Sequence, residues 1–177
     1  MPADLDHPRA LLINGTVGSG KTTTADAIGT QLRDRGVPHA VIDLDWLRNA
    51  WPAPVGDPFN DLIGLRNLES MITNFRSAGI QRFVLAGVLE STDWRQRYVT
   101  ALGVPLTVVR LVVELPALRR RLVARHPPGA DRDWHLHRSV ELNAILEQAA
   151  VDDLIIDVGA AGAATVAMRV SDAVGWS

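Results

Sequence analysis

Residues 10–22 read ALLINGTVGSGKT, and this stretch decides the fold of the chain. The apolar residues 10–13 predict a short buried strand, and the residues from Thr22 onward predict a helix. Between them, residues 15–22 follow the spacing G-x-x-x-x-G-K-[ST]. Glycines at these positions let the backbone curl, so that successive N–H groups point inward beside the positive end of the helix. The stretch therefore predicts a strand, an anion-binding loop and a helix, in that order.

Lys21 is the only lysine of the chain, and the other 17 basic side chains are arginine. An ammonium is a compact point charge on a slim stem, which suits a position between phosphate oxygens. We expect Lys21 to bridge the β- and γ-phosphates of ATP and the Thr22 hydroxyl to bind Mg²⁺. The alternative is a glycine-rich turn that matches the spacing by chance. The residues expected to hold the nucleotide are Gly15, Thr16, Val17, Gly18, Ser19, Gly20, Lys21, Thr22 and Thr23.

Length and composition narrow the class of protein. A chain of 177 residues with 47% hydrophobic content can form one well-buried core, so residues 1–177 are expected to be a single domain. A net charge of −2 lacks the basic excess typical of proteins that bind nucleic acid or anionic membranes. The absence of a signal-peptide pattern and of any apolar stretch near 18 residues favours a cytoplasmic location. The absence of cysteine excludes disulfides, thiol catalysis and cysteine-ligated zinc.

Strand and helix patterns alternate along the sequence. Strands are predicted at residues 10–13, 39–43, 82–86, 107–113 and 154–157. Helices are predicted at about residues 22–35, 62–75, 92–102, 115–125, 136–150 and 166–174. Short apolar strands separated by helices indicate a parallel sheet covered on both faces, which is a three-layer α/β domain. In such sheets the ligand lies beyond the carboxyl ends of the strands.

Asp43 and Asp45 directly follow the second predicted strand. If the backbone stays extended, two carboxylates at positions i and i+2 point the same way. Beside a phosphate loop they could act as a ligand of metal-bound water and as a general base. The alternative is a turn in which Asp45 caps a short helix that begins at Trp46.

Residues 119–125 form an arginine-rich run, RRRLVAR, within a predicted helix. Arg121 and Arg125 are four residues apart and share one face, whereas Leu118 and Leu122 share another. At least two guanidinium groups can therefore project together. The alternative is a solvated basic face near the helix C-terminus, where arginine favours the helix dipole.

Three features together resemble the small P-loop kinases, namely shikimate, gluconate and adenylylsulfate kinases and chloramphenicol phosphotransferase. They are the loop at residues 15–22, the Asp-x-Asp-x-x-Arg run of Asp43, Asp45 and Arg48, and the arginine-rich helix before a short connector. The resemblance implies an α/β/α P-loop NTPase fold with a five-stranded parallel sheet in the order 2-3-1-4-5. It covers nearly the whole chain as architecture, but only the phosphate loop is a specific motif.

The resemblance also implies roles for individual residues. Asp45 stands where the family has its base for the substrate hydroxyl, and Asp43 supports Mg²⁺ through water. Arg48 is implied to hold a polar or anionic substrate group, and Gly87 to let the substrate approach the backbone. The arginine-rich segment is implied to close over ATP and to neutralise charge on the transferred group. The implied catalytic residues are Lys21, Asp45, Arg121 and Arg125, and Arg119 joins the nucleotide-binding residues.

The leading hypothesis is an ATP-dependent transfer of the γ-phosphoryl group to a hydroxyl of a small molecule, by a monomer or homodimer. Alternatives are a nucleotide or adenylylsulfate acceptor, an NTPase or switch without an acceptor, and a regulator that only binds. Guanine-specific switches carry D-x-x-G after the third strand and N-K-x-D later. Residues 85–88 read LAGV, and no second lysine exists. Guanine recognition of that kind is therefore disfavoured.

Several other polar and aromatic residues are weaker candidates. His126, His135 and His137 lack carboxylate or cysteine neighbours at metal-ligand spacing, so we interpret them as surface or connector histidines. Residues 125–134 are too short for a large zinc-carrying lid. The remaining candidates for contacts with substrate or phosphate are Trp46, Trp51, Trp94, Glu90, Arg132 and Arg138, of which Trp94 is expected to belong to the core.

Overall fold

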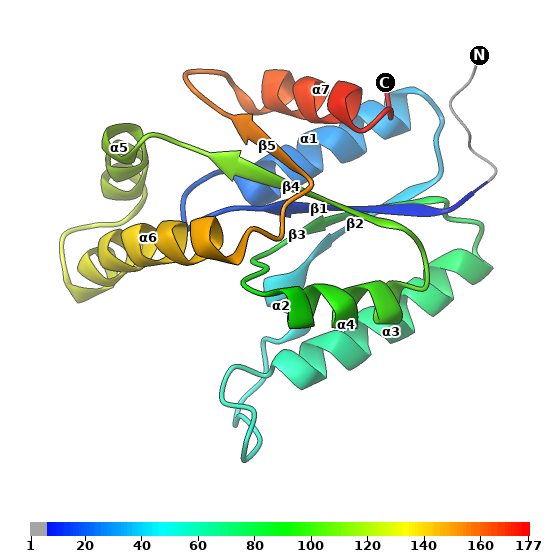
Figure 1. The fold of residues 1–177 in the computed structure, drawn as a ribbon, viewed down its shortest axis with the longest axis horizontal. Coiled ribbons are helices and arrows are strands. Elements are labelled where there is room, and N and C mark those ends of the chain that lie inside the picture. Colours follow the sequence, from blue (N-terminus) through cyan, green and yellow to red (C-terminus); the bar gives the residue numbers. More distant parts are fainter. Residues whose placement is uncertain (1–6) are drawn as a thin grey trace.

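A computed structural model describes residues 7–177, so residues 1–6, where no leader was predicted, lie outside the described residues. Five parallel strands form one sheet in the order β2-β3-β1-β4-β5, as the resemblance implied. The strands are β1 (Arg9–Asn14), β2 (His39–Asp43), β3 (Arg82–Ala86), β4 (Leu106–Val112) and β5 (Leu154–Asp157). The crossovers between these strands place their carboxyl ends at one edge of the sheet (Figure 1).

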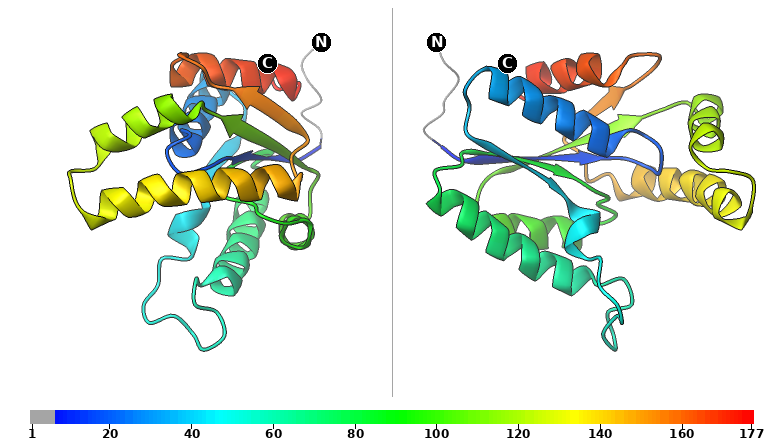
Figure 2. Two further views of the ribbon diagram at one scale, coloured as in Figure 1. Left: turned by 60° about the vertical axis from the view of Figure 1, so that its left-hand side comes forward. Right: turned by 180° about the vertical axis from the view of Figure 1, so that it is seen from behind.

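Helices cover both faces of the sheet (Figures 1 and 2). They are α1 (Lys21–Asp34), α2 (Leu44–Leu47), α3 (Asp61–Ser77), α4 (Thr92–Leu102), α5 (Leu115–Arg125), α6 (Ala130–Ala149) and α7 (Ala163–Ala173). Residues of α1, α5 and α7 pack on one face, and residues of α2, α3 and α4 pack on the other. This arrangement confirms the three-layer α/β/α fold.

The alternation of side chains along β1 explains why its sequence is apolar throughout. Leu11 and Ile13 pack against α1 and α7, whereas Ala10 and Leu12 pack against α3 and α4. A central strand of a covered parallel sheet is buried on both sides, so a continuous apolar run is expected. The strand is thereby fixed in the middle of the sheet, and its last residue, Asn14, begins the phosphate loop.

The predicted start of the helix at about residues 136–150 is wrong. Helix α6 begins at Ala130, whereas the apolar spacing indicated about residue 136. Its first turns are polar, but Asp131 and Asp133 lie in the first turn, where acidic side chains favour the helix dipole. Arg132 therefore lies on a helix, and the connection between α5 and α6 is short. No helix among residues 7–177 is long and apolar enough to span a membrane.

Candidate active site

The phosphate loop joins the end of β1 to the start of α1. Gly15 has φ 147° and Gly18 has φ 80°, a backbone region that favours glycine. Space is restricted as well: a Cβ at Gly18 would lie 2.9 Å from Leu122 Cδ2, and one at Gly15 would lie 2.6 Å from Ser19 Oγ. Both glycines are thus required by conformation and by close packing, and Gly15 is the first fixed position of the motif, which argues against a chance match.

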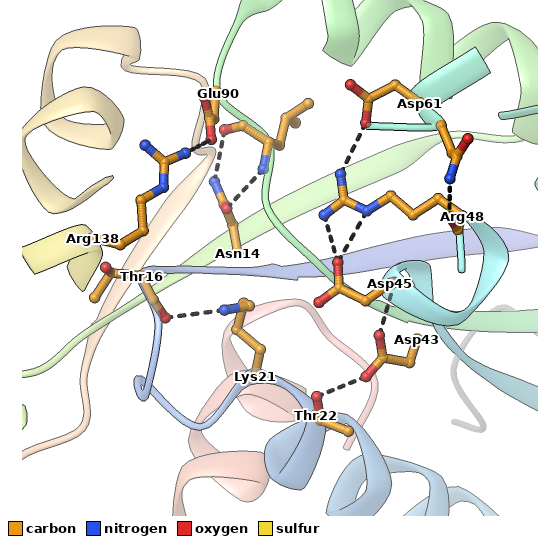
Figure 3. A network of polar contacts seen from close by, with 12 residues as sticks. Asn14, Thr16, Lys21, Thr22, Asp43, Asp45, Arg48, Asp61, Glu90 and Arg138 are labelled. Atoms are coloured by element: carbon orange, nitrogen blue, oxygen red, sulfur yellow. Dashed lines mark hydrogen bonds and ion pairs between the residues drawn. The ribbon is translucent and has the colours of Figure 1, made fainter. Parts of the chain in front are cut away.

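Lys21 begins α1 and is half-buried behind the loop. Its Nζ donates a hydrogen bond to the carbonyl oxygen of Thr16 at 3.0 Å (Figure 3). Burial lowers the pKa of Lys21 to about 8, although the nearby carboxylates of Asp45 and Asp43 oppose this shift. A polyphosphate bound in the loop would supply the negative charge that a backbone carbonyl lacks. The site is therefore suited to an anion.

A cavity of about 330 Å³ opens beside the loop. Its lining comes from the loop and the start of α1, from α5, and from the loop after β5 together with the start of α7: Gly18, Ser19, Gly20, Lys21, Thr22, Thr23, Thr24, Arg121, Leu122, Arg125, Val158, Ala161, Ala163 and Val166. Ser19 Oγ is buried and has no hydrogen-bond partner among the described residues. A phosphate oxygen would provide the missing acceptor, and the apolar part of the lining suits a nucleoside. The residues present therefore fit ATP.

The arginines of α5 differ in whether they reach the cavity. Arg121 and Arg125 line the cavity, as expected from their shared helix face. Arg119 is exposed and is not among the lining residues. Val17 is half-buried and packs against the core beside the loop. Only two of the expected arginines therefore face the space where phosphates would lie.

Thr22 and Asp43 form the contact expected of a magnesium site. Thr22 Oγ1 donates a hydrogen bond to Asp43 Oδ2 at 2.9 Å, and Asp43 Oδ1 accepts one from Asp45 N at 2.9 Å (Figure 3). Both carboxylate oxygens of Asp43 are thus oriented by neighbours. A hydroxyl next to a fixed carboxylate is the kind of oxygen set that binds hydrated Mg²⁺.

The expectation of an extended backbone after Asp43 is wrong, and so is the alternative that Asp45 is the cap. A short helix does form, but Asp43 is its N-cap and Asp45 lies in its first turn. The Asp43 side chain satisfies a free backbone N–H of this turn, which favours helix over extension. The two carboxylates consequently face different partners.

Asp45 is held by Arg48, and Arg48 is held in turn by Asp61 at the start of α3. Asp45 Oδ1 accepts from Arg48 Nη2 at 2.5 Å and Nε at 3.2 Å, and Arg48 Nη1 donates to Asp61 Oδ1 at 2.9 Å (Figure 3). Burial acts to lower the pKa of Arg48, but the bonds with Asp45 and Asp61 outweigh it and raise the pKa. Asp45 keeps 63% of its side chain exposed. Sequence reasoning missed Asp61.

Gly87 packs against Leu44, the first residue of α2. A Cβ at Gly87 would lie 2.6 Å from Leu44 Cδ1. The structure therefore gives this glycine a packing role, which lets α2 sit directly on the end of β3. The segment that carries Asp45 is positioned by this close approach.

Asn14, the last residue of β1, connects the phosphate loop, the loop after β3 and the segment before β5. Its Oδ1 accepts from Gly15 N at 2.9 Å and Leu89 N at 3.1 Å. Its Nδ2 donates to Leu89 O at 3.2 Å and to Asp152 Oδ1 at 2.9 Å. The side-chain amide thereby uses both donors and accepts two bonds. A buried Asn at the end of an apolar strand was the available sequence signal, and it was missed.

Two further contacts join α6 to the site. Thr16 Oγ1 donates to the carbonyl oxygen of Ser139 at 2.6 Å. Arg138 Nη2 lies 2.9 Å from Glu90 Oε1, so two weak candidates for contacts with substrate or phosphate pair with each other (Figure 3). Helix α6 is therefore coupled both to the phosphate loop and to the loop after β3.

The tryptophan candidates differ in burial. Trp94 packs against the core with Tyr98, their ring centres 6.2 Å apart, which confirms its expected core position. Trp46 and Trp51 are 75% and 93% exposed, and they lie in the segment between Asp45 and α3. These two side chains are available to a ligand.

Comparison with known proteins identifies the fold. Residues 1–56, which include the phosphate loop and Asp43, match the family described as Zeta toxin. The structure resembles the tunicamycin resistance protein of Deinococcus radiodurans, with a TM-score of 0.67 and 21% identity over 97% of this chain and 98% of that one. The chain has the fold of the small P-loop kinases.

Two other small P-loop kinases show the same likeness. A sugar kinase from Janibacter sp. has a TM-score of 0.64 and 17% identity over 96% of both chains. The APS kinase of Mycobacterium tuberculosis, solved with AMPPNP and APS, has a TM-score of 0.59 and 18% identity over 96% of this chain and 98% of that one. No curated protein matches the chain in sequence. At these identities the likeness establishes the fold and leaves the acceptor open.

Proposed function

We propose that the chain is an ATP-dependent phosphotransferase that moves the γ-phosphoryl group to a hydroxyl of a small molecule, with residues 1–177 acting as one domain. The observation that carries the proposal is the position of Lys21: it is half-buried behind a glycine loop and beside a cavity lined by Arg121 and Arg125. Three cations around one anion-sized space favour transfer of a charged phosphoryl group.

Each side of the site has a distinct task in this proposal. Lys21 and the loop N–H groups bind the phosphates, while Arg121 and Arg125 stabilise charge that develops on the transferred group. Thr22 would hold Mg²⁺ directly and Asp43 through water, and the ion would neutralise phosphate charge. These assignments need no rearrangement of the contacts between Thr22 and Asp43.

Asp45 is the proposed base for the acceptor hydroxyl. Arg48 engages only Oδ1 of Asp45, and the side chain remains largely exposed, so a hydroxyl can approach the other oxygen. Arg48 is bound by two carboxylates and therefore orients Asp45. These bonds use three of its five N–H groups, so Arg48 can also donate to an acceptor group without releasing either carboxylate.

The acceptor is proposed to carry an apolar part beside its hydroxyl. Four large apolar side chains are exposed in the segment that follows Asp45: Trp46, Trp51, Val55 and Phe59. Exposed aromatic groups next to a polar centre are typical of sites that bind a ring-bearing small molecule. This feature favours a partly apolar, ring-bearing acceptor over a small, fully polar sugar.

A transfer assay tests the proposal. Protein, Mg²⁺ and γ-labelled ATP are incubated with a panel of hydroxyl compounds that ranges from sugars and cyclitols to nucleosides and ring-bearing antibiotics. We expect label on an apolar ring-bearing acceptor, lost with Lys21→Ala. Release of inorganic phosphate alone, unchanged by every acceptor, would instead indicate an NTPase or switch.

A further inference from the structure

Three side chains that the phosphotransferase does not use meet where α5 joins α6. His126 is the C-cap of α5, and Asp131 and His135 lie four residues apart on the first turns of α6. A spacing of four places both on one face of the helix. The short connection at residues 127–129 reverses the chain between α5 and α6 (Figure 2). This reversal brings His126 into contact with Asp131. The interpretation of these histidines as lacking a carboxylate neighbour is wrong.

The distances within this cluster are those of a metal site. His126 Nδ1 lies 2.9 Å from Asp131 Oδ2, and His135 Nε2 lies 3.5 Å from Asp131 Oδ1. One ligand atom from each residue lies within 4.8 Å of the others. A tetrahedral zinc ion with bonds of about 2.0–2.1 Å holds its ligand atoms about 3.3 Å apart. The two distances of 2.9 and 3.5 Å lie on either side of that spacing.

The chemistry of the cluster also favours a cation. The two imidazole rings have centres 4.1 Å apart, and they share one carboxylate. One divalent ion accepts a lone pair from each neutral ring and from the carboxylate at once. Two imidazoles and a carboxylate form a donor set that suits zinc and neighbouring transition metals.

We propose that His126, Asp131 and His135 bind one zinc-class transition-metal ion, with a fourth position open to water. The absence of cysteine excludes thiolate ligation but not this nitrogen and oxygen set. The ion fastens the end of α5 to the start of α6. Arg125 immediately precedes His126 and lines the nucleotide cavity, so the metal limits the movement of that arginine. The metal site does not depend on the proposed function.

Direct metal titration of untagged protein tests this inference. Zn²⁺ is titrated against a chromophoric chelator, and Co²⁺ is added separately to record its visible absorption. We expect one Zn²⁺ per chain and a Co²⁺ spectrum typical of low coordination number. His126→Gln and His135→Gln should each weaken Zn²⁺ binding by at least about 100-fold, more than the loss of an outer contact.

Matched controls separate this site from others on the chain. His137→Gln makes the same change two positions along α6 at an exposed residue, and should leave zinc affinity unchanged. Asp43→Asn should also leave it unchanged, because Asp43 belongs to the phosphate-loop site. Asp131→Asn keeps the size of the side chain and should weaken binding while the circular dichroism spectrum stays that of the wild type.

A second readout uses Trp134, whose ring lies 4.9 Å from that of His135. Cu²⁺ at the site should quench this tryptophan, so that Trp134→Phe removes most of the metal-dependent loss of fluorescence. Equal loss of zinc affinity in His137→Gln and His126→Gln would overturn the inference. Unchanged zinc affinity in the folded Asp131→Asn protein would overturn it as well, because the Asp131 carboxylate would then not be a ligand.

Discussion

The lowered pKa of Lys21 makes nucleotide affinity depend on pH in a window where the nucleotide itself does not titrate. Burial brings the pKa of Lys21 to about 8 in the free protein, whereas bound phosphate should restore a value near the usual 10.5. The second ionisation of a phosphate group has a pKa of about 6, so it is nearly complete before Lys21 begins to titrate. We therefore expect ATP affinity to fall as pH rises above 8.

The magnitude follows from proton linkage. With a pKa of about 8, the fraction of free protein with protonated Lys21 falls from about nine-tenths at pH 7 to about one-thirtieth at pH 9.5, so apparent affinity should fall about 30-fold. Binding at pH 8 should take up about half a proton. Unfolding at Lys21 would not explain a loss of ATP affinity at high pH. Between pH 8 and 10.5 the unfolded chain binds more protons at Lys21 than the folded chain does. The contribution of Lys21 to the free energy of unfolding therefore increases as pH rises through this range.

Isothermal titration calorimetry in two buffers of different ionisation enthalpy measures both quantities. Lys21→Arg is the matched control, because a guanidinium stays protonated throughout this range. It should bind ATP more weakly, without the proton uptake and with little pH dependence. Constant wild-type affinity from pH 7 to 9.5, with no proton uptake, would refute the assignment of Lys21 as a half-buried phosphate ligand.

Three substitutions test the remaining roles. Asp45→Asn removes the proposed base but keeps the shape, so transfer to the acceptor should fall by roughly 10²- to 10⁴-fold while calorimetry shows ATP binding nearly intact. Asp43→Asn should raise the Mg²⁺ concentration needed for half-maximal transfer, because the group that orients metal-bound water is lost. Asn14→Leu should lower the free energy of unfolding by about 2–5 kcal/mol in urea titrations, since it leaves several buried polar groups without partners.

Opposite outcomes identify the faulty step in each case. Wild-type transfer by Asp45→Asn would remove the support for a base at that position. An acceptor-specific defect in Asp43→Asn, with an unchanged Mg²⁺ requirement, would mean that the two carboxylates have exchanged roles. Wild-type stability of Asn14→Leu would show that water satisfies the groups that the amide joins.

The phosphate loop and the strands could be predicted because their signals are local. The apolar residues of β1 must be buried on both faces, and the glycine spacing is a property of a few adjacent residues. Strands β2, β3 and β5 lie at the predicted positions. The start of α6 could not be found in this way, since its first turns are held by polar and capping interactions and not by an apolar stripe.

The hydrogen-bond and ion-pair partners of the polar residues could not be predicted, because they are set by tertiary contacts. Arg48 pairs with Asp61 across the loop between α2 and α3, and Asn14 reaches Leu89 and Asp152, which are distant in sequence. The close approach of His126 and Asp131 depends on the chain reversal between two helices. Spacing rules for single helices or short loops do not describe any of these contacts.

The unique lysine also gives the chain a single cleavage site for a lysine-specific endoprotease. The bond after Lys21 lies in the first turn of α1, directly behind the phosphate loop, so it can be cut only when this turn opens. Each molecule would yield two fragments, residues 1–21 and 22–177, and the rate of their appearance would report local opening of the loop. One digestion thus measures the motion of the segment on which the proposed phosphoryl transfer depends.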